Sequence, residues 1–247
     1  MPYLRNQHTR LYYEIVGQGT PMIMLNGFGN CVEDWYELGY IDALKNDYQL
    51  ILMDGRGFGK SDKPHDIEQY DISLRVTDVT AVLDALEIKQ AIVFGSSVNA
   101  ATVYALMGYC PERFLAYVSL GLSDYVDPTF NDWFQKGPQF VAEQTNALFD
   151  DVPQGLVLRY AQNDPQVFKI AFPKHAMDFS ENLSKVDAPV LLYVGEHDQV
   201  APKIQRHATL LKQGRCALLS GFGHCQAYWQ GAKALPMVKQ FLREYGL

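Results

Sequence analysis

The chain has 247 residues, 48 % of them hydrophobic, and 28 acidic against 21 basic side chains give it a formal net charge of −7. This balance argues against a nucleic-acid partner, because phosphate contacts need clustered Lys and Arg. No apolar window approaches the roughly 18 residues of a membrane span, and the N-terminus lacks the apolar core of a signal peptide. Four scattered cysteines without a C-x-x-C pair fit a reduced protein. We therefore expect a cytoplasmic protein with no membrane partner.

Runs typical of strands alternate along the chain with runs of helical periodicity. Seven strands are predicted, at residues 10–17, 21–25, 48–54, 90–95, 114–122, 189–196 and 215–221. Helices are predicted between them, and the helix at 99–109 is apolar nearly all round, which is typical of a buried helix. This alternation predicts an α/β fold in which a mostly parallel sheet is flanked by helices.

One segment, residues 123–186, interrupts this alternation. It contains no comparable strand, and aromatic residues and prolines punctuate its polar sequence. We interpret it as a small helical insertion, so that residues 1–122 and 187–247 form the core. Most of its aromatic residues are expected to pack within the insertion and the others to line a pocket. These aromatic residues are Trp133, Phe134, Phe140, Phe149, Phe168, Phe172 and Phe179.

The stretch "VFGSSVNAA" at residues 93–101 follows a buried strand and precedes a helix. A serine at such a bend can act as a nucleophile, provided that the residue two positions before it is small. Gly95 stands two before Ser97, whereas Phe94 stands two before Ser96. Ser97 is therefore the candidate nucleophile. The alternative for either serine is the cap of the following helix.

A serine hydroxyl needs a base, and the base needs an orienting carboxylate. Of six histidines, only His224 lies in a loop directly after a predicted core strand. Asp198 follows the strand before it, and Glu196 is nearer the strand end and is expected to be structural. Asp124 is a second possible acid, and His175 a possible substrate contact. Ser97, Asp198 and His224 would then follow the chain order Ser–Asp–His of one large class of hydrolases.

Acyl transfer also needs donors for the developing oxyanion. One donor is expected from the residue after the nucleophile, here the N–H of Val98, and one from an earlier strand–helix loop. The loop "NGFGN" at residues 26–30 follows a predicted strand, and its glycines let the backbone approach a substrate. The N–H of Phe28 is the second candidate.

The stretch "DGRGFGKSD" at residues 54–62 nearly matches a phosphate-binding loop. Asp54 stands where that motif has its first glycine, and "DKPHD" rather than a helix follows. We interpret the stretch as a structural turn after a strand, with Arg56 and Asp54 paired.

Together the motifs "NGFG", "DGRGFGKSD", "GSSVN", "GEHD" and "GFGH" resemble the α/β-hydrolase superfamily, above all its small carboxylesterase, lactonase and perhydrolase-like group. The resemblance covers nearly the whole chain and implies an α/β-hydrolase fold, a serine triad without a cofactor, and a cap formed by residues 123–186. Two residues depart from it. Asn26 replaces a usual histidine and could hydrogen-bond to hold its loop, and Asn99 replaces a usual glycine and could tilt the helix or narrow the pocket.

The expected function is hydrolysis of a small carboxylic ester or related acyl substrate by Ser97, His224 and Asp198, with Phe28 and Val98 as oxyanion donors. No metal-binding motif is present, and a serine argues against the carboxylate-dependent hydrolysis of epoxides or alkyl halides. The alternative, prompted by Asn26 and Asn99, is a ligand-sensing signalling protein with a slow or inactive hydrolase site. The sequence leaves the oligomeric state open.

Overall fold

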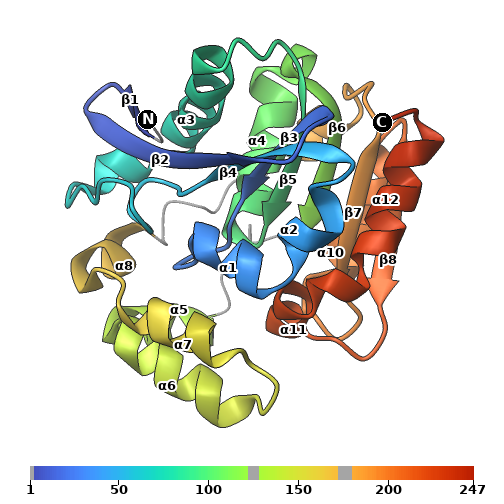
Figure 1. The fold of residues 1–247 in the computed structure, drawn as a ribbon. Coiled ribbons are helices and arrows are strands. Elements are labelled where there is room, and N and C mark those ends of the chain that lie inside the picture. Colours follow the sequence, from blue (N-terminus) through green and yellow to red (C-terminus); the bar gives the residue numbers. More distant parts are fainter. Residues whose placement is uncertain (1–2, 122–127, 172–179) are drawn as a thin grey trace.

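The computed structural model describes residues 3–121, 128–171 and 180–247. Within these ranges an eight-stranded sheet runs in the order β1-β2-β4-β3-β5-β6-β7-β8 (Figure 1). The strands β3 to β8 are parallel to one another, and β2 is antiparallel to both β1 and β4. This mostly parallel sheet confirms the predicted fold class. The strands are β1 (Tyr3–Asn6), β2 (Thr9–Val16), β3 (Thr20–Leu25), β4 (Tyr48–Met53), β5 (Ala91–Ser96), β6 (Phe114–Leu120), β7 (Val190–Gly195) and β8 (Gly214–Leu219).

The edge strand β1 is absent from the predicted strands. It pairs with β2 through a tight connection in which Gln7 has a φ of 51°. Glycine, asparagine and aspartate are the residues that usually mark such a turn in a sequence. Because Gln7 and His8 occupy this one, the turn carries no recognisable signal.

Helices cover both faces of the sheet, and alternate residues of each central strand face opposite layers. Ala91 and Val93 of β5 pack in one core cluster, whereas Ile92 and Phe94 pack in the other. This alternation follows from the pleat of a strand. The first cluster includes residues of α3 (Ile72–Ala85), α4 (Val98–Tyr109) and α10 (Ala201–Leu210), and the second those of α1 (Val32–Glu37), α2 (Tyr40–Leu44), α11 (His224–Trp229) and α12 (Leu235–Glu244). Short 3₁₀ helices lie at Ile67–Tyr70, Pro111–Arg113 and Gly231–Lys233.

Between β6 and β7 the chain forms α5 (Pro128–Lys136), α6 (Pro138–Leu148), α7 (Gln154–Ala161), α8 (Pro165–Ala171) and α9 (Ser180–Leu183). We call α5 to α8 the inserted helices. They gather at one end of the molecule, beyond the ends of the parallel strands (Figure 1). Leu183 and Val186 instead pack in the same core cluster as α4 and α10. The insertion boundaries at residues 123 and 186 remain a prediction.

The predicted pairing of Arg56 with Asp54 is wrong. Arg56 forms a buried ion pair with Asp78 of α3, with Nε 2.6 Å from Oδ2 and Nη2 2.7 Å from Oδ1. The Asp54 carboxylate instead accepts the backbone N–H groups of Val32 at 2.7 Å and Lys60 at 2.8 Å. Burial raises the pKa of Asp54 to about 7, against the lowering effect of these two N–H donors. The Asp54 carboxylate in the turn after β4 therefore holds the start of α1 through the backbone N–H of Val32.

Candidate active site

Ser97 occupies a sharp bend between β5, which ends at Ser96, and α4, which begins at Val98. Its backbone has φ 54° and ψ −116°, one of three positive φ values among the described residues other than glycine. Such a conformation costs about 1–3 kcal/mol and persists only where the surroundings impose it. Here the Ser97 N–H donates to the Leu120 carbonyl of β6 at 2.8 Å. The strained bend projects Ser97 beyond the carboxyl end of the sheet.

The neighbours of Ser97 explain why it, rather than Ser96, can occupy the exposed corner. A Cβ atom at Gly95 would lie 2.5 Å from Cγ2 of Val103 and 2.6 Å from the carbonyl oxygen of Asn99, so only glycine lets α4 pack this closely. Ser96 is 1 % exposed, and its hydroxyl has no hydrogen-bond partner in the described ranges. The structure thus places the Ser96 side chain in the core.

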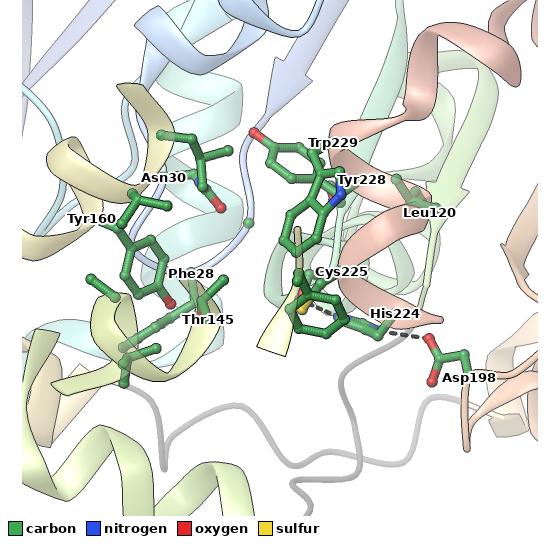
Figure 2. Close-up of a pocket in the computed structure, with 18 of the residues that line it drawn as sticks. Phe28, Asn30, Leu120, Thr145, Tyr160, Asp198, His224, Cys225, Tyr228 and Trp229 are labelled. Carbon is green, nitrogen blue, oxygen red and sulfur yellow. Dashed lines mark hydrogen bonds and ion pairs between the residues drawn. The ribbon is translucent and has the colours of Figure 1, made fainter. Parts of the chain in front are cut away.

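The structure brings Ser97 together with His224 and Asp198. The Ser97 Oγ lies 2.9 Å from Nε2 of His224, and Nδ1 of the same ring lies 2.6 Å from Oδ2 of Asp198. Asp198 follows β7, and His224 begins α11 directly after β8. Figure 2 shows His224 beside Cys225, with the carboxylate of Asp198 on its outer side. Three side chains from the ends of three strands thus form one hydrogen-bonded chain.

The electrostatics of this chain keep Asp198 ionised. Burial raises its pKa, but the hydrogen bond and charge of His224 and the Val200 N–H outweigh that effect, and the net pKa lies below the ordinary value. The Val200 N–H donates to the other carboxylate oxygen at 3.1 Å. Burial raises the pKa of the neighbouring Cys225 thiol to about 12, with a smaller effect from Asp198. The thiol therefore stays protonated near neutral pH.

No other candidate acid or base predicted from the sequence is seen, among the described residues, in the hydrogen-bonded chain of Ser97, His224 and Asp198. Glu196 accepts the Ser220 hydroxyl at 2.9 Å and the Gly221 N–H at 3.1 Å, so it braces the loop after β8. Asp124 and His175 lie outside the described residues, as do Phe172 and Phe179.

The loop "NGFGN", which we call the oxyanion loop (residues 26–30), passes close to Ser97. A Cβ atom at Gly27 would lie 3.5 Å from that of Ser97. The Phe28 ring packs on Phe58, Phe134 and Phe168, with centroids 4.8–4.9 Å apart. Val98 is 1 % exposed and packs in the same cluster. Phe28 and Val98 thus lie in one apolar cluster, and their N–H groups remain predicted oxyanion donors.

A cavity of about 300 Å³ opens over the triad and is lined mainly by apolar side chains. Figure 2 shows Tyr160 and Thr145 on the side of the cavity opposite His224 and Asp198. Burial raises the pKa of Tyr160 well above its usual value, so its phenol stays neutral. The inserted helices contribute Phe134, Val141, Ala142, Thr145, Leu156, Val157 and Tyr160, together with Phe149 from the turn after α6. Of the aromatic residues predicted for the insertion, Phe134 and Phe149 therefore line the cavity.

The sequence reasoning missed Gly121, which follows β6 with a φ of 58°. A Cβ atom there would lie 3.0 Å from Cε1 of His224 and 3.7 Å from Oδ2 of Asp198. Glycine therefore makes room for the histidine beneath the end of β6. Its position at the end of a buried strand, like that of Gly95, is a signal that could have identified it.

Two further properties concern the described ranges alone. Their His, Cys, Asp and Glu side chains form no group of three or more that could hold a metal ion. No helix in them combines the length and apolar character needed to cross a bilayer.

The chain was compared with known proteins. Residues 20–182 match the family described as the alpha/beta hydrolase fold. The chain is 29 % identical to the 2-hydroxymuconate semialdehyde hydrolase of Pseudomonas sp. (strain CF600), over 92 % of its own length and 88 % of that enzyme. It is 23 % identical to Epoxide hydrolase 4 of Homo sapiens, over 77 % of this chain and 53 % of that protein.

A solved structure supports the same fold. The enol-lactonase from Burkholderia xenovorans LB400 superposes with a TM-score of 0.86 at 20 % identity, over 98 % of this chain and 100 % of that one. The family match spans more than half of the chain, and the sheet order and the bend at Ser97 agree with it. The protein belongs to the α/β-hydrolase fold family and is a hydrolase by family.

Proposed function

We propose that the protein is a serine hydrolase that cleaves a small carboxylic ester or related acyl substrate through an acyl-enzyme intermediate. The observation that carries this proposal is the hydrogen-bonded chain from Ser97 Oγ through His224 to Asp198, with separations of 2.9 and 2.6 Å. It lies on the wall of an apolar cavity that can hold a small acyl group.

In the acylation step, Nε2 of His224 takes the Ser97 proton while Oγ bonds to the substrate carbonyl carbon. The carbonyl oxygen becomes an oxyanion, which the N–H groups of Phe28 and Val98 stabilise. The carbonyl then re-forms, the bond to the alcohol oxygen breaks, and His224 gives its proton to the departing alcohol. Asp198 holds the imidazole in the tautomer that this requires and stabilises its charged form.

In the deacylation step, His224 takes a proton from water as the water oxygen bonds to the acyl carbon. The bond from that carbon to Ser97 Oγ then breaks, and the proton returns from His224 to Ser97. The products are the carboxylic acid and the free enzyme, with no redox change and no co-reactant other than water.

The cavity favours a neutral, largely hydrocarbon acyl group. Neither Lys nor Arg is among the described residues that line it, so an anionic substituent would lose its hydration there without gaining a counter-ion. The neutral Tyr160 hydroxyl and the Thr145 hydroxyl could donate to one polar substituent opposite the triad.

The direct test is covalent labelling with an alkyl fluorophosphonate, followed by hydrolysis of short p-nitrophenyl esters. We expect stoichiometric labelling at Ser97 and loss of both labelling and turnover in Ser97→Ala, by at least about 10³-fold. Ser96→Ala is the matched control, because its side chain is buried one position away; its labelling should survive. Labelling that persists in Ser97→Ala would disprove the assignment. A wild-type protein that binds esters but is neither labelled nor active would favour the ligand-sensing role instead.

A further inference from the structure

We infer that Asn99 is a positioning residue of the proposed reaction, because its side chain fixes the oxyanion loop from the first turn of the nucleophile's own helix. The inference rests on the proposed acyl-transfer function. Asn99 and Asn26 depart from the family's usual residues, and the structure shows that they are in direct contact. Their contact is a hydrogen bond between the first turn of α4 and the start of the oxyanion loop.

The central contact joins the elbow to the loop. Nδ2 of Asn99 donates to the backbone carbonyl of Asn26 at 2.5 Å. Oδ1 of Asn99 accepts the Thr102 hydroxyl at 2.8 Å, one turn further along α4. Since Thr102 is 1 % exposed, its hydroxyl holds the amide so that the NH₂ group faces the loop. Asn99 is not among the described residues that line the cavity of the active site; its side chain faces the loop instead.

The Asn26 side chain makes a second contact, with the helix that carries His224. Oδ1 of Asn26 accepts the Tyr228 hydroxyl at 3.0 Å, as expected if Asn26 holds its loop by hydrogen bonding. The Tyr228 carbonyl in turn accepts the Tyr40 hydroxyl at 2.9 Å. One residue, Asn26, is thus hydrogen-bonded both to α4, which follows the nucleophile, and to α11, which begins at the base.

Peptide planarity carries this positioning one residue into the oxyanion loop, to the peptide before the one that bears the Phe28 N–H. In a trans peptide the carbonyl and the following N–H point in opposite directions. The Asn99 bond to the Asn26 carbonyl therefore sets the direction of the Gly27 N–H and anchors the loop one peptide before the Phe28 N–H. Gly27 and Gly29, which has a φ of 75°, leave the loop free to adopt other conformations. At its other end, Nδ2 of Asn163 from the turn after α7 donates to the Gly29 carbonyl at 2.7 Å.

The test compares Asn99→Asp, Asn99→Leu and Tyr228→Phe with the wild type on a p-nitrophenyl ester. Asp and Leu keep the number and branching of the heavy atoms of Asn but lack the amide donor. We expect kcat to fall roughly ten- to a hundredfold in both, and about three- to tenfold in Tyr228→Phe, with KM changed less than about threefold. A trifluoromethyl ketone forms a tetrahedral adduct whose oxyanion needs the same donors. Its Ki should rise in proportion to the loss in kcat/KM.

Ser119→Ala is the control, since it also removes a buried hydroxyl, one without a hydrogen-bond partner in the described ranges; its kcat and Ki should not change. A purely structural role for Asn99 would lower Tm without moving Ki relative to KM. If the Asn99 variants and Tyr228→Phe all keep kcat within about twofold of wild type, the inference is overturned. The proposed function would still stand in that case, provided that Ser97 of the wild type is labelled. An unlabelled wild type would overturn both. Should the Asn99 variants fail to fold, Tyr228→Phe, which removes one oxygen atom, tests the inference instead. The same quantities decide, namely the loss in kcat/KM and the rise in Ki of the trifluoromethyl ketone.

Discussion

The sheet with its flanking helices and the inserted helices are held together in different ways. In the core, large side chains such as Trp35, Tyr40 and Phe94 are fully buried between helices and sheet. The inserted helices also share apolar contacts with the core, around Phe28 and Phe168. Among the described residues, their polar attachments to the core include the bonds of Arg159 to Asp34 and Glu37 of α1, of Asn163 to the oxyanion loop, and of Asp164 to His65.

This difference separates two requirements of the site. The proposed triad must be held to within fractions of an ångström, and its members come from the ends of β5, β7 and β8 in the core. The far wall of the cavity comes from α6 and α7, where substitutions can alter shape without unfolding the sheet. We therefore expect core substitutions at the site to act mainly on kcat and substitutions in the inserted helices to act mainly on KM.

The largest effect is expected for Asp198→Asn. An amide in place of the carboxylate can favour the wrong imidazole tautomer and cannot stabilise the imidazolium, so kcat should fall on the order of 10³–10⁴-fold with KM nearly unchanged. Steady-state kinetics on the p-nitrophenyl ester measure this. Glu196→Gln is the matched control two residues away, because Glu196 bonds Ser220 and Gly221 rather than the histidine. A comparable loss in Glu196→Gln would contradict the assignment of Asp198.

A smaller effect is expected for Arg159→Met, which removes the ion pair between α7 and α1. Nε of Arg159 lies 2.7 Å from Oδ1 of Asp34, a residue that is 1 % exposed. Burial raises the pKa of Asp34, and the Cys31 N–H and the Arg159 charge act against it, with a net pKa above the ordinary value. Without Arg159 the buried carboxylate loses its counter-ion, and α7 loses its ion pairs with α1.

For this variant we expect KM to rise about tenfold with kcat within about threefold, and stability to fall by about 1–2 kcal/mol. Ester kinetics and urea unfolding give the two values. Arg215→Met is the comparison, since it breaks an exposed pair with Glu244 at 2.6 Å far from the cavity; it should change neither. If kcat fell as far as in Asp198→Asn, the proposed division between the two regions would be wrong.

The smallest effect is expected for Asp164→Asn at the start of α8. Burial raises the pKa of Asp164, but the hydrogen bond from His65 and the N–H groups of Val167 and Gln166 outweigh it, so the net pKa is lowered. An acid with a lowered folded-state pKa adds stability above its unfolded pKa of about 3.9, and this stability is lost as the pH falls through the folded-state value.

The unfolding free energies of wild type and Asp164→Asn should therefore differ by less than about 1 kcal/mol near neutral pH and converge below about pH 4. Urea titrations at several pH values measure the difference. Asn can still cap the start of α8. The comparison of wild type with Asp164→Asn therefore reports the charge of the Asp164 carboxylate alone. A difference that persists far below pH 4, where the carboxyl is protonated in both states, would contradict the lowered pKa.

Much of the fold was predictable because its signals are local. Apolar runs bounded by turn residues indicate buried strands, and helical periodicity between them indicates crossovers, so seven strands and the parallel arrangement followed from the sequence. The strand β1 did not, because its turn at Gln7 and His8 lacks the usual residues. Ser97, Asp198 and His224 could be selected because each follows a predicted strand, and parallel strands end at the same edge of a sheet.

By itself the sequence determined the family, the order of the strands along the chain and the candidates for nucleophile, acid and base. Tertiary structure alone decided which side chains meet: Arg56 pairs with Asp78 rather than Asp54, and Asn99 bonds the Asn26 carbonyl. The physical reason is the separation along the sequence over which each interaction acts. Backbone conformation follows largely from neighbours in sequence, whereas a hydrogen bond between residues 73 positions apart depends on how closely two packed elements approach.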